Sequence, residues 1–140
     1  MIPSSDLQIL TFHFKRFTLH AKALSGFCRG DYICIKAITL GERKKEKDAY
    51  DIFFCIDNFP GGPRALAREF LAIIGDPLVA EGISVLREKF ARLDGVGPVW
   101  AALVAAGGDC ENVEVMQNWQ RRAFEIVNAL LRGLDGFALA

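Results

Sequence analysis

Apolar residues recur at intervals of three and four along most of the chain, and this pattern predicts a series of amphipathic helices. The first helix is expected to begin at Asp31, a suitable N-cap, and helical character then continues through residues 44–58. Prolines and glycines within residues 58–63 end the helical character of residues 44–58. The next helix is expected over residues 64–74. The positions expected to face the core are Ile33, Ala37, Leu40, Tyr50, Phe53, Phe54, Leu66, Phe70 and Ile73.

The second half of the chain shows the same helical spacing. Asp76 and Pro77 are typical of an N-cap and a first-turn proline, and they open another helix. After a break at residues 94–98, a short apolar helix leads to a glycine pair, and Asp109 is expected to cap the longest helix. The positions expected to be apolar contacts here are Val79, Ile83, Leu86, Phe90, Trp100, Leu103, Val104, Val113, Met116, Trp119, Phe124, Val127, Leu130 and Leu134.

The N-terminal residues fit two periods at once. The alternation of Phe12 and Phe14 with polar neighbours suggests a strand. Leu10, Phe14 and Phe17 instead mark one face of a helix, so residues 7–22 are left open between the two.

The pattern as a whole predicts a mainly α fold, a helical bundle of five to six helices with a short irregular or β N-terminal segment. With 140 residues, 51% of them hydrophobic, the chain has apolar material for one core. Residues 1–140 are therefore expected to form a single domain. Residues 1–30 would be an N-terminal remnant of it, and residues 31–134 its helical part.

Composition also bears on location and redox state. No apolar run approaches the roughly 20 residues of a membrane helix, and the first residues carry no secretory signal. We therefore expect a cytoplasmic protein without a membrane partner. The four cysteines form no CxxC and have no zinc-ligand spacing with the two histidines, so buried reduced thiols are expected.

Formal net charge is zero, but the charges are unevenly placed. Residues 13–47 hold nine basic side chains against three acidic ones, and this is where an anionic partner would dock. The alternative is that the basic and acidic regions face each other within the fold or in a dimer.

Residues 36–51 combine cations with carboxylates at helical spacing. If they form one helix, or two nearly collinear helices, Lys36, Arg43 and Lys47 share one face. Asp51 then lies at the end of that face. Such a face suits a triphosphate, because cations neutralise phosphate oxygens while a nearby aspartate orients a metal, a ribose hydroxyl or a nucleophile.

The alternative for the same segment is solvated helix surface. Seven consecutive charged residues run from Glu42 to Asp48, and such runs usually face water. Pairs such as Lys44 with Asp48, and Lys47 with Asp51, would then add a few tenths of a kcal/mol each.

These residues resemble the last conserved motif of the abortive-infection (AbiEii-like) nucleotidyltransferases, the toxin components of type IV toxin–antitoxin systems. That motif is a Lys, then a basic run, then Lys/Arg-Asp-x-x-Asp-hydrophobic. This chain has Lys36, a basic run and Lys47-Asp-Ala-Tyr-Asp-Ile52. Residues 86–91 and 96–100 also resemble helices downstream of the motif in one branch of the family, so that the resemblance covers residues 31–134.

The resemblance implies roles for individual residues. Lys36 takes the place of the motif lysine, which is expected to contact nucleotide phosphate, with Arg43 and Lys47 as supporting cations. Asp48 and Asp51 take the places of the motif's two aspartates as catalytic residues, and which of them faces the nucleotide is left open. An intact family member is expected to use Mg²⁺ and a nucleoside triphosphate.

Other features of that family are missing. Its members carry a Gly-Ser turn and then an Asp-x-Asp/Glu pair that holds the metal. This chain has no Gly-Ser dipeptide and no acidic residue between Asp6 and Asp31. Its Asp-x-Glu at Asp109 and Glu111 is explained by helix capping. We therefore expect a truncated or split member that is inactive alone, takes no cofactor by itself and carries nucleotidyl transfer as a family-level label.

A second hypothesis is a helical protein-interaction module that binds a separately encoded catalytic half or an antitoxin. The basic region and the eleven Phe favour it, and a homo-oligomer is a related expectation. Nucleic-acid binding through the basic residues 13–47 is a third hypothesis and would show steep salt dependence. It is not the expected function, because the aromatics and cations of residues 12–17 form only one short segment. Both histidines lie close to that segment without an acidic partner, which argues against a catalytic triad.

Overall fold

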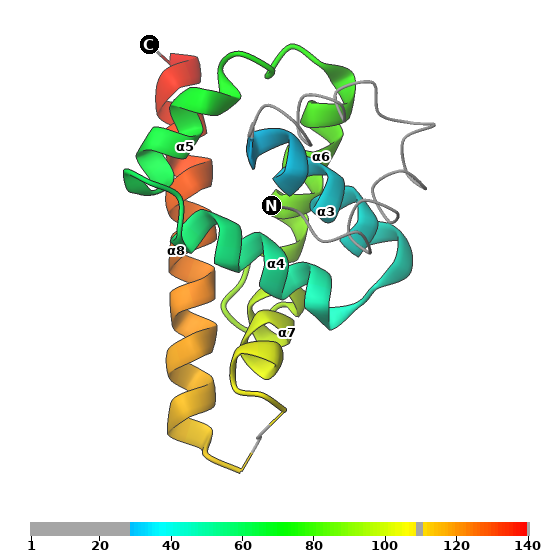
Figure 1. The fold of residues 1–140 in the computed structure, drawn as a ribbon, viewed down its shortest axis with the longest axis vertical. Helices are drawn as coiled ribbons and strands as arrows, with labels where there is room; N and C mark the ends of the chain where they lie inside the picture. The colour runs from blue at the N-terminus through cyan, green and yellow to red at the C-terminus, as the bar shows by residue number, and fades with distance from the viewer. Residues whose placement is uncertain (1–28, 109–110, 140) are drawn as a thin grey trace.

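The computed structural model describes residues 29–108 and 111–139, which form six helices (Figure 1). The helices are α3 (Arg29–Arg43), α4 (Glu46–Asp57), α5 (Gly62–Phe70), α6 (Pro77–Lys89), α7 (Val96–Ala105) and α8 (Val113–Leu139). The prediction of a mainly α helical bundle is confirmed. The predicted irregular or β segment at the N-terminus, and with it residues 7–22, lies outside the described residues.

Helix α3 is covered by its neighbours on several sides, since it packs against α4, α5 and α6. Every residue from 30 to 40 is buried except Tyr32, which is partly buried. The prediction that only one face of this helix is buried is therefore incomplete, because α3 is buried on almost all sides. Polar residues of α3 must find partners in the interior, and the Thr39 hydroxyl donates a hydrogen bond to the Ile35 carbonyl oxygen at 2.7 Å.

Helix α8 is the longest of the six and packs along α5 and α7 (Figure 1). Its predicted stripe holds in the second half, where Val127, Leu130 and Leu134 are buried. Trp119 packs against the same core from a partly exposed position. Val113 is 62% exposed, so the stripe prediction is wrong at its first position.

One predicted helix cap is confirmed and another is replaced. The Asp76 carboxylate accepts a hydrogen bond from the Leu78 backbone N–H at 2.8 Å, as expected of an N-cap. At the start of α8, the Asn112 side-chain oxygen accepts from the Val115 N–H at 3.1 Å. Asn112 therefore caps α8 in the role predicted for Asp109, which lies outside the described residues.

Three other predictions are wrong in detail. Helix α3 begins at Arg29, so Asp31 lies in its first turn and is not the N-cap. The helix predicted over residues 64–74 is α5, which begins at Gly62 and gives way to turns after Phe70. On α4, Phe53 is buried as predicted, but the adjacent Phe54 faces outward because neighbouring helix positions point about 100° apart.

Two cysteines can be compared with the expectation of buried reduced thiols. Cys34 is a buried thiol that donates a hydrogen bond to the Val79 carbonyl oxygen at 3.7 Å, which confirms the expectation for that residue. Cys55 is also a thiol, but it is only partly buried. Cys28 and Cys110 lie outside the described residues.

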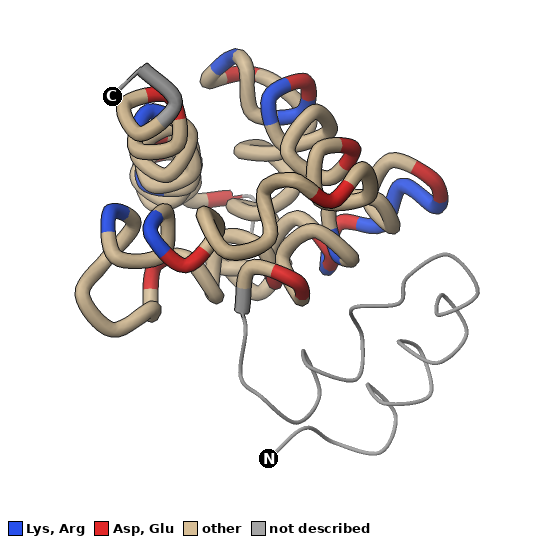
Figure 2. The backbone as a smooth tube through the Cα atoms, turned by 90° about the horizontal axis from the view of Figure 1, so that it is seen from above, with Lys and Arg blue, Asp and Glu red and all other residues tan. Residues whose placement is uncertain are grey.

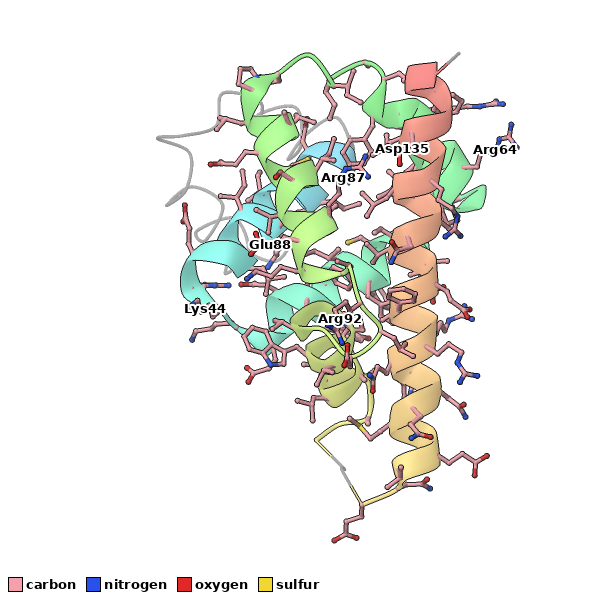
Figure 3. The ribbon with its side chains drawn as sticks, turned by 180° about the vertical axis from the view of Figure 1, so that it is seen from behind. Lys44, Arg64, Arg87, Glu88, Arg92 and Asp135 are labelled. Atoms are coloured by element: carbon pink, nitrogen blue, oxygen red, sulfur yellow. The ribbon has the colours of Figure 1, made fainter. Side chains whose placement is uncertain are left out.

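Two ion pairs connect α8 to the rest of the bundle. Arg87 on α6 and Asp135 on α8 point toward one another (Figure 3), and the Arg87 Nη2 lies 2.6 Å from the Asp135 Oδ1. Arg122 on α8 makes a similar contact of 2.7 Å with Asp57 at the end of α4. The arginine of each pair is exposed, so each contributes less than about 1 kcal/mol and mainly orients the helices.

Helix α3 crosses closely over α6, where a glycine allows backbone contact. A Cβ atom on Gly82 would lie 2.8 Å from the Cβ and 2.9 Å from the Cα of Cys34. Such distances are too short for any side chain, so α3 and α6 can approach this closely only with glycine at position 82.

Among the described residues, no helix combines the length and apolar character that crossing a bilayer demands.

We predict that Gly82→Ala destabilises the protein by about 1–3 kcal/mol, because the added methyl group forces α3 and α6 apart. Gly41→Ala is the matched control on the facing helix. Its Cβ would meet Val85 at an ordinary 3.6 Å, and alanine favours a helix interior over glycine by about 0.5–1 kcal/mol. Urea unfolding of both variants measures the difference, and equal stabilities would contradict the predicted close crossing.

Candidate functional site

The connection between α3 and α4 determines how the charged segment is arranged. Helix α3 ends at Arg43, and Lys44 takes a left-handed backbone conformation with a φ of 54°. Lys45 is extended and serves as the N-cap of α4. The chain therefore turns at residues 44–45 and α4 packs against α3 (Figure 1). The prediction of one helix, or of two nearly collinear helices, is wrong.

The turn nevertheless brings the predicted site residues together across the two helices. The Arg43 guanidinium donates two hydrogen bonds of 2.9 Å, one to each oxygen of the Asp48 carboxylate. The Lys36 Nζ lies 3.0 Å from the Asp51 Oδ2 and 3.6 Å from the Asp48 Oδ1. The Lys47 Nζ lies 3.3 Å from the same Asp51 oxygen. We call these five residues, Lys36, Arg43, Lys47, Asp48 and Asp51, the ionic cluster.

The ionic cluster is graded from a buried interior to an exposed edge. The Asp48 side chain is fully buried, and the Lys36 side chain is only 7% exposed. Asp51 is intermediate, Arg43 is exposed, and the Lys47 side chain is the most accessible at 71%. A ligand arriving from solvent would therefore meet Lys47 and Arg43 before Lys36.

The arrangement satisfies the charges that it buries. A buried carboxylate is costly unless it is paired and hydrogen-bonded, and Asp48 has both the fork of Arg43 and the nearby ammonium of Lys36. The hydrogen bonds to Asp48 raise the pKa of the Arg43 guanidinium above its ordinary value, although burial acts in the opposite direction. The Lys36 ammonium also lies 5.6 Å from the centre of the Tyr32 ring, a cation–π contact.

The pairing differs from the one expected of a solvated helix. Lys47 pairs with Asp51 as that alternative predicts, but Asp48 pairs with Arg43 and Lys36 instead of Lys44. The pairs of Lys36 and Arg43 therefore join α3 to α4, whereas the Lys47–Asp51 pair lies within α4. Figure 2 shows basic and acidic positions gathered at the α3–α4 turn, on the right of that view.

The residues of the ionic cluster do not fit a magnesium ion. Mg²⁺ prefers carboxylate and water oxygens, but both carboxylates here already face cations, and the cluster has three cations to two carboxylates. Within residues 29–108 and 111–139, no group of three or more His, Cys, Asp or Glu side chains is placed to hold a metal ion. The metal of the resembled family therefore has no evident ligands in the cluster.

A groove of about 250 Å³ lies between α3 and α6. Its charged lining is Glu42, Glu81, Glu88 and Lys89, beside the apolar Ile38 and Val85. Three carboxylates against one lysine repel a phosphate, so this groove does not suit the ligand for which the ionic cluster was predicted.

We predict that Asp48→Asn destabilises the protein by about 1–3 kcal/mol, because Arg43 loses its buried charged acceptor and Lys36 keeps only Asp51. Asp94→Asn is the matched control, since Asp94 accepts the same two-pronged contact from Arg92 but is exposed. Its loss should cost far less, because water screens an exposed pair. Thermal or urea unfolding measures both variants, and a similar small loss in each would mean that the buried pair contributes little.

Comparison with protein-family models, with curated proteins and with solved structures found no match for this chain. The chemistry of the ionic cluster is therefore inferred from its residues and their arrangement.

Proposed function

We propose that this chain is the helical, phosphate-contacting part of an AbiEii-like nucleotidyltransferase. The observation that carries the proposal is the ionic cluster, in which two helices bring three cations onto two carboxylates. The excess positive charge lies at an edge that is open to solvent, where Lys47 is exposed. A triphosphate is an anion of the size and charge that such an edge attracts.

The exposure of each residue assigns it a part in phosphate binding. Lys47 and Arg43 make the first contacts, because they are the accessible cations. Asp51 bridges the Lys36 and Lys47 ammonium groups, so it holds the exposed Lys47 at the edge where a phosphate arrives. Asp51 is therefore the aspartate that faces the nucleotide, whereas the buried Asp48 is a positioning residue that holds Arg43.

In this proposal, the carboxylates that hold the metal come from a second polypeptide. Both carboxylates of the ionic cluster are engaged by cations, so the cluster binds and orients phosphate without activating a nucleophile. Mg²⁺ then enters with the nucleotide and the catalytic partner.

A protein-interaction module is the second candidate. Large apolar side chains are exposed in several places, including Leu71 and Ile74 after α5 and Val113 and Val115 at the start of α8. Such side chains suit contact with a partner protein, which would be the catalytic half or an antitoxin.

We predict that the purified chain binds tripolyphosphate at low ionic strength and that Lys47→Gln weakens this binding about fivefold, because one contacting cation is lost. Arg64→Gln is the control, since it removes the same charge from α5, on the opposite side of the molecule from the α3–α4 turn (Figure 3). Isothermal titration calorimetry measures both variants. If the two substitutions weaken binding equally, the binding reflects net charge and not the ionic cluster. If the unmodified chain does not bind tripolyphosphate, the proposal is overturned.

We further predict that the chain alone transfers no nucleotide to RNA or protein acceptors from any nucleoside triphosphate. The reason is that both aspartates of the cluster are paired with cations and are not free to hold a metal. Incubation with labelled nucleotides and Mg²⁺ tests this. A metal-dependent transfer signal that disappears in Asp51→Ala would show that the chain carries a complete active site.

A further inference from the structure

The exposed face of α4 continues from the ionic cluster onto an aromatic side chain. Lys47, Asp51 and Phe54 follow one another at intervals of four and three, so they lie along one side of the helix. Lys47 marks the charged end of this face, and Phe54, which is 50% exposed, marks the other. The face therefore pairs an accessible cation with an accessible phenyl ring.

The position of the Phe54 ring is supported by its neighbours on α4. The ring centre lies 5.8 Å from that of Tyr50, with the two planes tilted by 35°. Tyr50 in turn meets Phe53 edge to face at 6.2 Å, and Phe53 meets Trp119 of α8 at 6.0 Å. This chain of ring contacts links the exposed Phe54 to the core, so that one of its faces can remain open to a ligand.

The spacing along the helix suits a nucleotide. Phe54 follows Lys47 by seven positions, which corresponds to about 10 Å along the helix axis. An extended nucleoside triphosphate covers a comparable span from its terminal phosphate to its base. Aromatic side chains stack on any nucleobase, because every base has a flat π face.

We propose that Phe54, supported by Tyr50, is a stacking platform for the base of the nucleoside triphosphate whose phosphates contact Lys47 and Arg43. This inference rests on the proposed function and adds to it a subsite for the base. Since stacking reads the flat face and not the edge of a base, the platform accepts all four nucleotides and favours purines for their larger rings.

The test compares ATP, CTP and tripolyphosphate on the full chain by calorimetry. Phe54→Ala should weaken ATP binding about tenfold, in keeping with the loss of one stacked base, and leave tripolyphosphate binding unchanged. Phe54→Trp should retain or improve ATP binding. Leu71→Ala is the matched control, because Leu71 is an equally exposed apolar residue on another element, and it should alter neither ligand.

The outcomes separate this inference from the proposed function. Tripolyphosphate binding as tight as that of ATP in the unmodified chain, or equal ATP binding in Phe54→Ala and Leu71→Ala, would overturn the base platform and leave the phosphate contacts standing. Failure of tripolyphosphate itself to bind would remove the proposed function and the platform together. A single-stranded RNA that binds more tightly than ATP, with the same loss in Phe54→Ala, would overturn the assignment to a mononucleotide.

Discussion

The pairing of a buried aspartate with the end of the preceding helix constrains the rest of the site. Asp48 lies fully inside the hairpin formed by α3 and α4, and its two oxygens accept hydrogen bonds from Arg43. A buried carboxylate is costly unless partners such as these hydrogen-bond to it. Its burial therefore fixes the register of α4 on α3, and the positions of Lys36 and Asp51 follow from that register.

The ionic cluster has two parts with different tasks. Its inner part, Asp48 with Arg43 and Lys36, is a closed network in which each charge has a partner. Its outer part, Asp51 with Lys47, is accessible and shares its carboxylate with Lys36. Networks of this kind are costly to disturb at the buried end and inexpensive to rearrange at the surface, so ligand recognition belongs to the outer part together with the exposed Arg43 guanidinium.

Much of the helical bundle could be predicted from apolar spacing, because residues such as Ile33, Leu86 and Leu130 recur with the helical period and are buried. The turn at Lys44 could not be predicted. Lysine rarely takes a left-handed backbone conformation, and no glycine or asparagine occupies that position to indicate one. The grouping of the charged residues was predicted on the assumption of nearly collinear helices, yet the turn produces the same grouping by another route. Asn112 and Asp109 are equally good caps, so spacing alone could not choose between them.

Helix α8 has a consequence for local stability. Its residues before Trp119 are exposed or only partly buried, whereas its second half contributes Val127, Leu130 and Leu134 to the core. Tertiary packing, and not intrinsic propensity, supplies most of the stability of a helix in a protein. The first two turns of α8 therefore belong to the least protected part of the bundle, and local opening can begin there while the α3–α4 hairpin stays folded.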